Sequence, residues 1–548
     1  MPSNTVDRRT FLKLSGGAAA TMALAGCTGG DTGGTTTTTD SGGTGTTTDT
    51  TTTAGGGQQD FDLTITQGSL PAGLDPHDHR ETPTEVVMLH VYEGVLTRDA
   101  DGKILESLAT EWERVEGENA ITFQLRDGVT FHNGDELTPE DVAYSINRIV
   151  DDEVGFASPQ SDQLAGVTGA EAMDGAVRVM NDGLNPIVFS EFATYCDIMQ
   201  QSWVEDRSQA EIAGDMNGTG PFQLESYTED EEVVLIRYDD YWQEPAAAAS
   251  VTFRGAAESS TRVNQLLAGE TDIVVNVPPQ EVQRVNDSDN ATIAAAPSTR
   301  LLFNALRYDV EPFSSKEFRQ ALNYAVDLNS IIQNVLGGFG GPTSQPTLPN
   351  FVGYNPDLSP YEYDPERAAE LVEQSGHAGV EIEMHTPVGR YLKDLEIAEA
   401  VAGFINDLPN VTATVRQRDF GSLVDELLTG NIEDKPPWYL IGWGEATFDG
   451  GLVMTALLKS DGALTTFSNE ELDQLLTRAG NEEGDTRAQT LMDANALCHE
   501  EAPWIFLNQQ YSVYGVNSAL NWEARADERI DAYAITKTSP TWALDVFS

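Results

Sequence analysis

The chain has 548 residues, and its 88 Asp and Glu against 31 Lys and Arg give a formal net charge of −57 at pH 7. This charge excludes a nucleic-acid-binding protein, because the field of the protein would repel phosphate groups. Acidic disorder is also excluded, since 40% of the residues are hydrophobic and 8% are aromatic. The composition instead indicates a soluble protein adapted to molar salt, where charges are screened over about 3 Å.

The N-terminal residues predict an export signal followed by a lipid anchor. Arg8 and Arg9 precede the sequence Thr-Phe-Leu-Lys, which is typical of a twin-arginine signal, and residues 14–25 form a weakly apolar run. A membrane-spanning helix needs about 20 apolar residues, so this run is predicted to be the core of a cleavable signal. The sequence LAGC at residues 24–27 looks like a lipobox and makes Cys27 the predicted lipidation site. The alternative is a protein exported without lipidation, in which Cys27 is incidental.

Removal of the predicted signal, residues 1–26, would leave a segment at 27–59 that is nearly all Thr, Gly and Asp. Such a segment cannot bury enough apolar surface to offset the entropy of ordering, so we expect a disordered tether that holds a domain off the membrane. The remaining stretch of about 490 residues is too long for one core and predicts two or three domains. Cys196 and Cys498 lie far apart in it and are expected to be buried free thiols.

Hydrophobic periodicity and turn residues predict alternating strands and helices along the rest of the chain. The predicted elements are a strand at 60–66, a helix at 84–96, a hairpin at 120–134 with its turn at Asp127-Gly128, a helix at 138–150, a strand at 231–242, a helix and a strand within 259–276, and helices at 315–338, 364–376 and 391–408. The helix at 138–150 has a clear start signal, with Thr138 as its cap and Asp141 three residues later. The alternation favours an α/β fold.

Motifs for catalysis and for direct metal binding are absent from the sequence. It contains no Gly-x-Ser-x-Gly elbow and no His-Glu-x-x-His helix, and the glycine-rich residues 337–341 follow a helix, which argues against a phosphate loop. His77 and His79 form the only close histidine pair, and we interpret them as part of a solvated loop because no third ligand is suggested. We therefore predict no enzyme activity, no cofactor and no metal, with a secreted hydrolase as the alternative.

Motifs spread over most of the chain resemble those of one known family. They lie in order at residues 108–149 (with a Trp, FQLR and FHNG), 218–242 (beginning GTGPFQLESY), 268–273 (AGETDI), 318–327 (FRQALNYAVD), 361–376 (YEYDPERAAELVEQSG) and 503–510 (PWIFLNQQ). Together, behind the lipobox, these segments resemble the solute-binding lipoproteins of ABC importers, family 5, which bind peptides, nickel or oligosaccharides. The acidic composition points to a member from a salt-adapted prokaryote.

The resemblance implies a two-lobed α/β fold of the periplasmic-binding-protein type, of the large (type II) group with an additional inserted subdomain. Lobe I is expected at 60–100, 214–300 and 509–548, the inserted subdomain at 101–213 and lobe II at 301–508. In this family the lobes close on a hinge around the solute. The implied solute is small and polar, most readily a di- or oligopeptide. The implied partners are an ABC permease and its ATPase, and the implied location of this chain is the extracellular face of the cytoplasmic membrane. A nickel–metallophore complex, a sugar or an opine is the alternative solute.

Two segments resemble ligand-binding segments of the family. Residues 440–451 (LIGWGEATFDGG) occupy the place where peptide-binding relatives carry a Trp-x-x-Asp segment that holds the peptide amine. Trp443 matches the aromatic residue, but Ala446 stands near the expected Asp, so Glu445 and Asp449 are the available substitutes and we prefer Asp449. Relatives that bind glutathione or sugar phosphates carry a W-G-x-x-T-x-D form that is more similar to this one.

Residues 386–394 (TPVGRYLKD) resemble a Gly-Arg-Tyr segment in which the arginine reaches the acidic group of the ligand. Arg390 is therefore predicted to bind a carboxylate or phosphate, which a guanidinium group contacts through two hydrogen bonds. The alternative is a surface arginine near a helix start. Tyr92, Phe303 and Asn304 are lesser candidates for ligand contact.

The charge predicts that the fold loosens in dilute buffer. The screening length rises from about 3 Å in 1 M salt to about 30 Å in 0.01 M salt, so repulsion among the carboxylates is expected to strengthen. Circular dichroism of the purified chain should lose native character when KCl is diluted from 2 M to 0.01 M. An unchanged spectrum at low salt would contradict the prediction.

Overall fold

The computed structural model describes residues 60–537, apart from positions 80, 155, 165, 428, 430 and 463. The predicted signal, Cys27 and the tether lie outside the described residues. Within these residues, no helix has the length and apolar character needed to cross a membrane.

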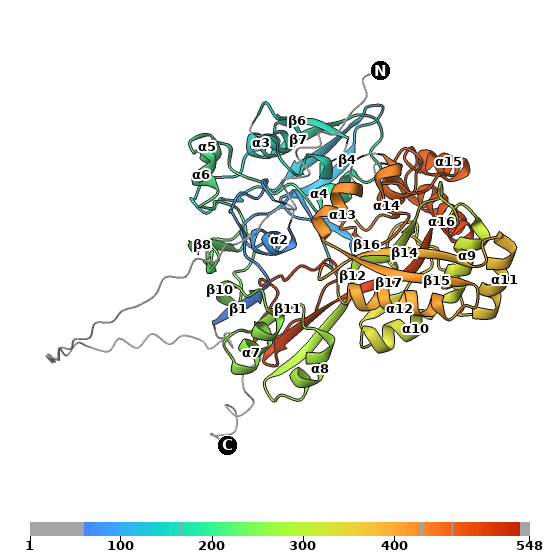
Figure 1. The fold of residues 1–548 in the computed structure, drawn as a ribbon. Coiled ribbons are helices and arrows are strands. Elements are labelled where there is room, and N and C mark those ends of the chain that lie inside the picture. The colour runs from blue at the N-terminus through green and yellow to red at the C-terminus, as the bar shows by residue number, and fades with distance from the viewer. Residues whose placement is uncertain are drawn as a thin grey trace, which may run out of the picture.

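Two long strands, β12 (Ala291–Leu306) and β17 (Trp504–Asn517), form the centre of an eleven-stranded sheet (Figure 1). From edge to edge the strands are β15 (Val411–Arg418), β14 (Val380–Pro387), β16 (Trp438–Gly444), β12, β17, β11 (Ile273–Val275), β1 (Phe61–Gln67), β10 (Ala248–Gly255), β9 (Glu232–Arg237) and β8 (Phe222–Thr228), with β13 (Gly340–Pro342) paired to β17. The register of the antiparallel β12–β17 pair shifts between Pro297 and Leu301. A bulge at this point separates two paired stretches of the same two strands, and a second register shift follows between Leu302 and Phe303.

The lobe II side of this bulge contains β14, β15 and β16, and both faces of its sheet are covered by helices. Helices α9 (Lys316–Ala325), α11 (Pro365–Ser375) and α12 (Asp394–Asn406) pack on the face that holds Leu302 and Leu440. The other face holds Leu301, Phe303 and Trp504, and it is covered by α13 (Phe420–Leu427), α14 (Gly450–Leu457), α15 (Glu470–Ala479) and α16 (Gly484–Glu501). Neighbouring residues of β12 therefore belong to two different cores, as the strand period of two requires.

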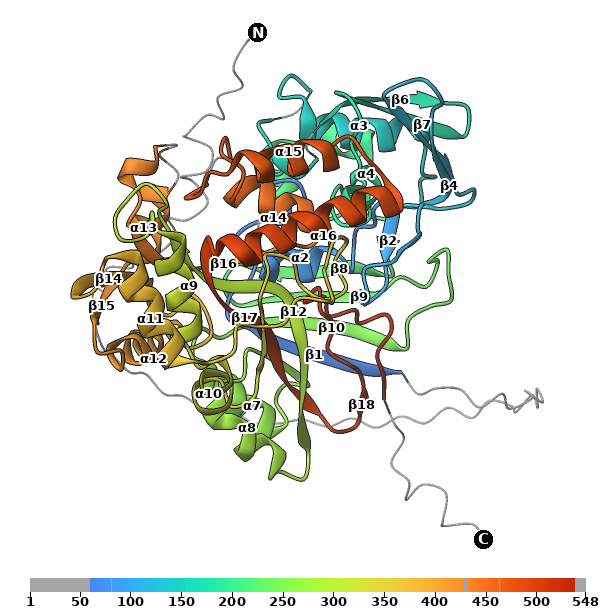
Figure 2. The same ribbon diagram turned by 90° about the vertical axis from the view of Figure 1, so that its right-hand side faces the viewer.

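The lobe I side contains β11, β1, β10, β9 and β8, which share a core with α2 (Thr82–Met88). Helices α7 (Ser259–Ala268) and α8 (Pro279–Asn286) pack on β11 and the far end of β17. A separate antiparallel sheet packs on α3 (Pro139–Val150), and its strands in order are β4 (Ala109–Arg114), β5 (Ala120–Leu125), β7 (Ala176–Asn181) and β6 (Val167–Met173). Figure 2 shows this sheet beside α3, away from the long strands.

The remaining described elements are short. They are α4 (Val188–Phe192), α5 (Gln201–Glu205), α6 (Gln209–Ile212), α10 (Leu328–Ser330), β2 (Leu96–Arg98), β3 (Ile104–Glu106), β18 (Leu520–Asn521), β19 (Thr536–Lys537), two 3-10 turns (Ser161–Leu164 and Ile432–Asp434) and a π-helical turn (Ile331–Val335).

Several elements predicted from local signals are confirmed. Helix α3 begins after Thr138, whose hydroxyl accepts the Asp141 N–H while the Asp141 carboxylate accepts the Thr138 N–H. Helix α7 ends at Gly269, which has a φ of +75°, a conformation that favours glycine. Cys196 and Cys498 are buried free thiols, and burial raises the pKa of both.

Three predicted elements are wrong. No second strand of the hairpin forms after β5, because both edges of β5 are already occupied by β4 and β7. The long helix at 315–338 is two pieces, since α9 ends at Ala325 and Asp327 caps a new turn by accepting the Ser330 N–H. The helix at 84–96 is only the short α2, followed by loop and then by strand β2.

The interpretation of His77 and His79 as a solvated loop is also wrong, since both side chains are buried. Asp75 accepts two hydrogen bonds from Arg148 of α3, at 3.0 and 2.6 Å, and this buried ion pair holds the segment against the helix. The His77 ring nitrogen Nε2 lies 2.7 Å from the Asp197 carbonyl oxygen. Burial lowers the pKa of His77 to about 3, so the ring is neutral at pH 7.

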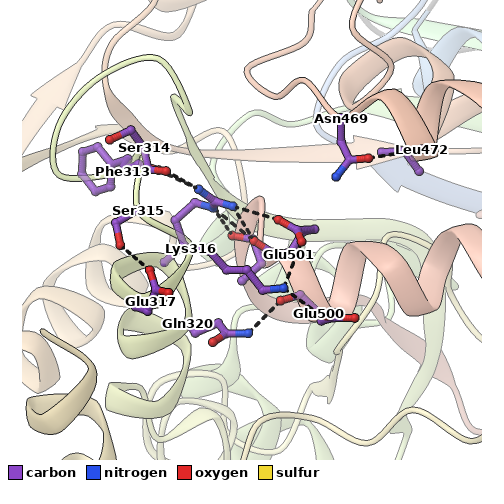
Figure 3. A network of polar contacts seen from close by, with 12 residues as sticks. Phe313, Ser314, Ser315, Lys316, Glu317, Gln320, Asn469, Leu472, Glu500 and Glu501 are labelled. Atoms are coloured by element: carbon purple, nitrogen blue, oxygen red, sulfur yellow. Dashed lines mark hydrogen bonds and ion pairs between the residues drawn. The ribbon is translucent and has the colours of Figure 1, made fainter. Parts of the chain in front are cut away.

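Polar contacts fix the start of β17. Lys316 of α9 donates to the carboxylates of Glu500 and Glu501 at the end of α16, at 2.7 and 2.9 Å (Figure 3). Arg319, one turn further along α9, donates to the main-chain carbonyls of Glu501 and Ala502. The end of α16 is thereby held against α9 immediately before the chain enters β17.

The Asp75–Arg148 pair predicts a large stability cost for one substitution. Asp75→Asn keeps the side-chain shape but leaves the Arg148 guanidinium buried without a counter-charge, which is expected to lower the free energy of unfolding by about 3–5 kcal/mol. Urea unfolding at constant KCl measures the difference. Glu118→Gln is the matched control, because the Arg178–Glu118 ion pair is solvent-exposed and is expected to contribute about 0–1 kcal/mol. Equal losses in both variants would contradict the prediction.

Candidate functional site

The bulge in β12 places an arginine at the boundary between the two paired stretches. Arg300 is the first residue of β12 that pairs with β16, opposite Gly444, and its side chain is half-buried. Nearby, the Ser298 hydroxyl donates to the Gln510 carbonyl, and the Gln509 side chain donates to the Ser298 carbonyl. The backbone around Arg300 is therefore held by β17 on one side and by β16 on the other.

A tight loop before α12 positions Arg390. The buried carboxylate of Asp394 accepts hydrogen bonds from the main-chain N–H groups of Gly389, Arg390 and Tyr391, at 3.0, 2.8 and 3.1 Å. The Tyr391 hydroxyl donates to the Gly442 carbonyl of β16 at 3.2 Å. Because the backbone on both sides of Arg390 is fixed, its side chain starts from a defined position.

Two glycines of β16 make room for the side chains on one face of the strand. A Cβ atom on Gly442 would lie 2.9 Å from the Tyr391 ring, and one on Gly444 would lie 3.0 Å from the Arg300 guanidinium. Residues two apart on a strand share a face and are separated by about 7 Å. Tyr391 and Arg300 therefore rest side by side on β16.

The Arg390 guanidinium lies over two aromatic rings, 5.0 Å from the centre of Tyr391 and 5.1 Å from that of Phe420. Its side chain is exposed to solvent, yet the pKa of Arg390 is lowered, first because the surrounding protein displaces water and second because the charge of Arg300 is near. Arg390 is thus open to solvent on one side and surrounded by protein on the other, and the surface formed by Arg300, Arg390, Tyr391 and Phe420 beside β16 is called the wall below. Glu528 and Asp394 oppose the shift electrostatically.

The predicted aromatic residue Trp443 lies on the opposite face of β16. Its side chain packs against the core that contains Phe303 and Trp504, whereas Arg390 and Tyr391 lie on the face of Gly442. The structure therefore does not bring Trp443 and Arg390 together on one face of the strand.

Glu445, directly after β16, is buried in a turn. Its carboxylate accepts hydrogen bonds from the N–H and the hydroxyl of Thr447, at 3.1 and 2.7 Å. Burial raises the pKa of Glu445 to about 7, and the neighbouring Asp449 contributes in the same direction. Trp443 also lies near this carboxylate, although its indole N–H makes no hydrogen bond of acceptable geometry within the described residues.

Asp449 is buried and caps helix α14. Its carboxylate accepts the Gly451 N–H at 2.7 Å and a hydrogen bond from Arg487 at 2.9 Å. Burial raises the pKa of Asp449, although Arg487 opposes the effect. Both of these partners belong to the fold, and they use the carboxylate that was predicted to contact the ligand. The predicted ligand contact of Asp449 stays a prediction.

The loop after β16 touches the lobe I side of the molecule. Phe448 lies 5.5 Å from the Arg98 guanidinium, and a Cβ atom on Gly102 would lie 2.6 Å from the Phe448 ring. Glu191 of α4 is near as well, since burial raises its pKa to about 8 and Glu445 adds to the shift. These contacts join β2, the loop after it and α4 to the turn that holds Glu445.

The lesser candidates are all buried. Tyr92 is 1% exposed, and its hydroxyl accepts the Asn217 N–H at 3.4 Å. Phe303 stacks on Trp504 with 3.8 Å between ring centres, and the fully buried Asn304 amide makes no hydrogen bond within the described part of the chain. Any ligand contact by these three side chains stays a prediction.

Tyr92 lines a cavity of about 440 Å³ on the lobe I side. The cavity is also lined by charged residues, among them Glu93, Asp197, Arg98 and Arg529. None of its lining residues comes from 301–508. Burial raises the pKa of Asp197 to about 8. This cavity is separate from the wall that carries Arg390.

Among the described residues, no group of three or more His, Cys, Asp and Glu side chains is arranged to hold a metal ion. Arg300 was not among the residues predicted from the sequence. The one sequence feature that marks it is its position as a charged residue in the otherwise largely apolar stretch STRLLFNAL at 298–306. Its neighbours in the fold come from segments near 390 and 444, so no local motif reveals the cluster.

Comparison with known proteins places the chain in a family. Residues 103–464 match the model for bacterial extracellular solute-binding proteins, family 5 Middle. The glutathione-binding protein GsiB of Pectobacterium atrosepticum is 24% identical over 468 residues, which cover 81% of this chain and 88% of that protein.

Solved structures share the fold at low sequence identity. The periplasmic binding protein DppA of Helicobacter pylori, in complex with the peptide STSA, has a TM-score of 0.72 and 21% identity, covering 88% of this chain and 99% of that one. NikA of Staphylococcus aureus, in complex with Ni(L-His)2, has a TM-score of 0.69 and 19% identity, covering 88% and 100%. The expected two-lobed α/β fold is confirmed. Because the family model spans most of its length, the chain belongs to the bacterial extracellular solute-binding proteins of family 5.

Proposed function

We propose that this chain is the solute-binding component of an ABC importer that captures a di- or oligopeptide between its lobes and releases it chemically unchanged to a permease and its ATPase. The observation that carries the proposal is Arg390, an exposed guanidinium without a carboxylate partner, fixed beside the bulge of the crossing strands. A peptide C-terminus supplies the carboxylate that such a group binds through two hydrogen bonds. The STSA peptide bound to the Helicobacter pylori relative supports a peptide as the solute.

The lobes are proposed to hinge at the bulge. The expected boundary between residues 300 and 301 falls within the register shift of β12, where the ladder of hydrogen bonds is locally interrupted. Opening about this point would separate Phe448 from Arg98 and Gly102 and would expose Glu445 to a ligand. We propose Glu445 as the partner of the peptide amine, because Asp449 is already held by Arg487.

Anchoring and export are proposed from the N-terminal sequence alone. Arg8 and Arg9 support twin-arginine export, and Cys27 supports a lipid anchor on the extracellular face of the cytoplasmic membrane, with residues 27–59 as the tether. The second candidate solute is a nickel complex, as in the Staphylococcus aureus relative. Within the described residues no direct metal site exists, so nickel would have to enter as a complex with an organic ligand.

Ligand binding is tested by thermal unfolding with tri-alanine, glutathione and Ni(L-His)2. Tri-alanine is expected to raise the Tm with the logarithm of its concentration, by an amount equivalent to about 2.7 kcal/mol at 100 times the Kd. Arg390→Ala is expected to weaken tri-alanine binding about 10- to 100-fold, because a hydrogen bond to a charged group contributes about 1.5–3 kcal/mol. Calorimetric titration measures both affinities.

The control for this substitution is Arg367→Ala, which removes an exposed arginine from the outer face of α11. It is expected to leave the affinity for tri-alanine unchanged. Equal affinities of Arg390→Ala and the unsubstituted chain would remove Arg390 from the site. A rise in Tm with Ni(L-His)2, and no rise with tri-alanine or glutathione, would favour the nickel complex as the solute.

The pKa of Glu445 predicts the pH dependence of peptide binding. The carboxyl group is neutral below about pH 7 and ionised above it, and only the ionised form pairs with an ammonium group. The affinity for tri-alanine is therefore expected to rise with pH up to about pH 7 and to fall above about pH 8, where the peptide amine loses its proton. Glu445→Gln should remove this rise, whereas the exposed control Glu118→Gln should retain it. A persisting rise in Glu445→Gln would contradict the assignment.

A further inference from the structure

Arg300 and Arg390 differ from every other described arginine in having neither an ion-pair nor a hydrogen-bond partner for the guanidinium. The others have a carboxylate within ion-pair distance or, like Arg207 and Arg262, donate to backbone carbonyls. In a chain with 88 acidic residues, carboxylates are abundant, so two unpaired arginines in one place need an explanation.

The two guanidinium groups lie on the same wall. Arg300 rests on Gly444, Tyr391 rests on Gly442 two residues earlier, and Arg390 lies over the Tyr391 ring. The charge of Arg300 lowers the pKa of Arg390, which agrees with this arrangement. Two like charges held together without a counter-ion raise the free energy of the unliganded protein, and an anion bound between them relieves that cost.

Within the described residues, no nearby carboxylate forms an ion pair with either guanidinium. Asp394 uses its carboxylate on three main-chain N–H groups of its own loop. Glu528 faces Arg390 from the C-terminal segment but accepts the Ser512 hydroxyl at 2.8 Å, and it forms no ion pair with either arginine in the described part of the chain. Tyr391 donates its hydroxyl to Gly442. Both carboxylates partly offset the positive charge, but neither binds a guanidinium, so the hydrogen-bond donors of Arg300 and Arg390 are available to a ligand.

We propose that Arg300 and Arg390 together bind a doubly anionic end of the solute, either a pair of carboxylates, as in a C-terminal aspartate, or a phosphate group. The inference rests on the proposed solute-binding function and narrows its ligand class. Arg390 supplies the contact that any peptide carboxylate uses, and Arg300 adds selectivity for the second negative charge. The edge-to-face rings of Tyr391 and Phe420 under Arg390 and the glycine under Arg300 restrict the distance between the two groups.

The test compares tripeptides with and without an additional anionic group on the C-terminal residue. Calorimetric titrations at constant KCl use Ala-Ala-Asp against Ala-Ala-Asn, and Ala-Ala-phosphoserine against Ala-Ala-Ser. The unsubstituted chain is expected to bind at least one anionic peptide about tenfold more tightly than its neutral partner. The pair with the larger ratio identifies carboxylate or phosphate as the second charge.

Arg300→Gln is expected to reduce this ratio to about one, because it removes the charge that contacts the second anionic group. Arg367→Gln, which removes the same charge from the surface of α11, should keep the ratio. Equal affinities within both peptide pairs, or a ratio that survives Arg300→Gln, would overturn the inference and leave peptide binding intact. A chain that binds none of the four peptides would overturn both the peptide assignment and the inference.

Discussion

The pairing of β12 with β17 is the constraint on which the rest of the structure depends. Both strands continue through the central sheet from the lobe I side to the lobe II side, so the two sides are joined by main-chain hydrogen bonds rather than by loose linkers. Register shifts between Pro297 and Leu301 and between Leu302 and Phe303 interrupt this ladder. A bulge bends a strand and changes the direction of its side chains, which places Arg300 where a regular strand would have continued the packed faces.

Charge imposes the second constraint. Most arginines of this acidic chain are bound to carboxylates, and the deeply buried Asp75–Arg148 pair shows how such a contact fixes a segment far away in the sequence. Arg390 is fixed differently, since Asp394 binds the main chain of the loop and leaves the guanidinium unpaired. An acidic protein can keep an anion-binding wall only if its own carboxylates are engaged elsewhere in this way.

The sequence predicted those parts of the fold that depend on neighbouring residues. The cap of α3, with Thr138 and Asp141, and the end of α7 at Gly269 involve contacts within a few residues. The predicted hairpin after β5 was wrong because strand pairing there is determined by tertiary contacts. Both edges of β5 are occupied, one by β4 and the other by β7. The burial of His77 depends on Arg148, more than 70 residues away. Arg390 was found through a family motif, whereas Arg300 has no local signal.

The sequence Gly-Trp-Gly at the end of β16 connects these constraints. In a strand the side chains alternate, so Trp443 faces the core of Phe303 and Trp504 while both glycines face the opposite side. On that side, the absence of Cβ atoms lets Tyr391 and Arg300 approach the backbone. One short segment thus packs the interior with its tryptophan and shapes the wall with its glycines. Changes at Arg300 or Arg390 can therefore alter what the wall binds without disturbing the core behind it, because the two functions lie on opposite faces of the same strand.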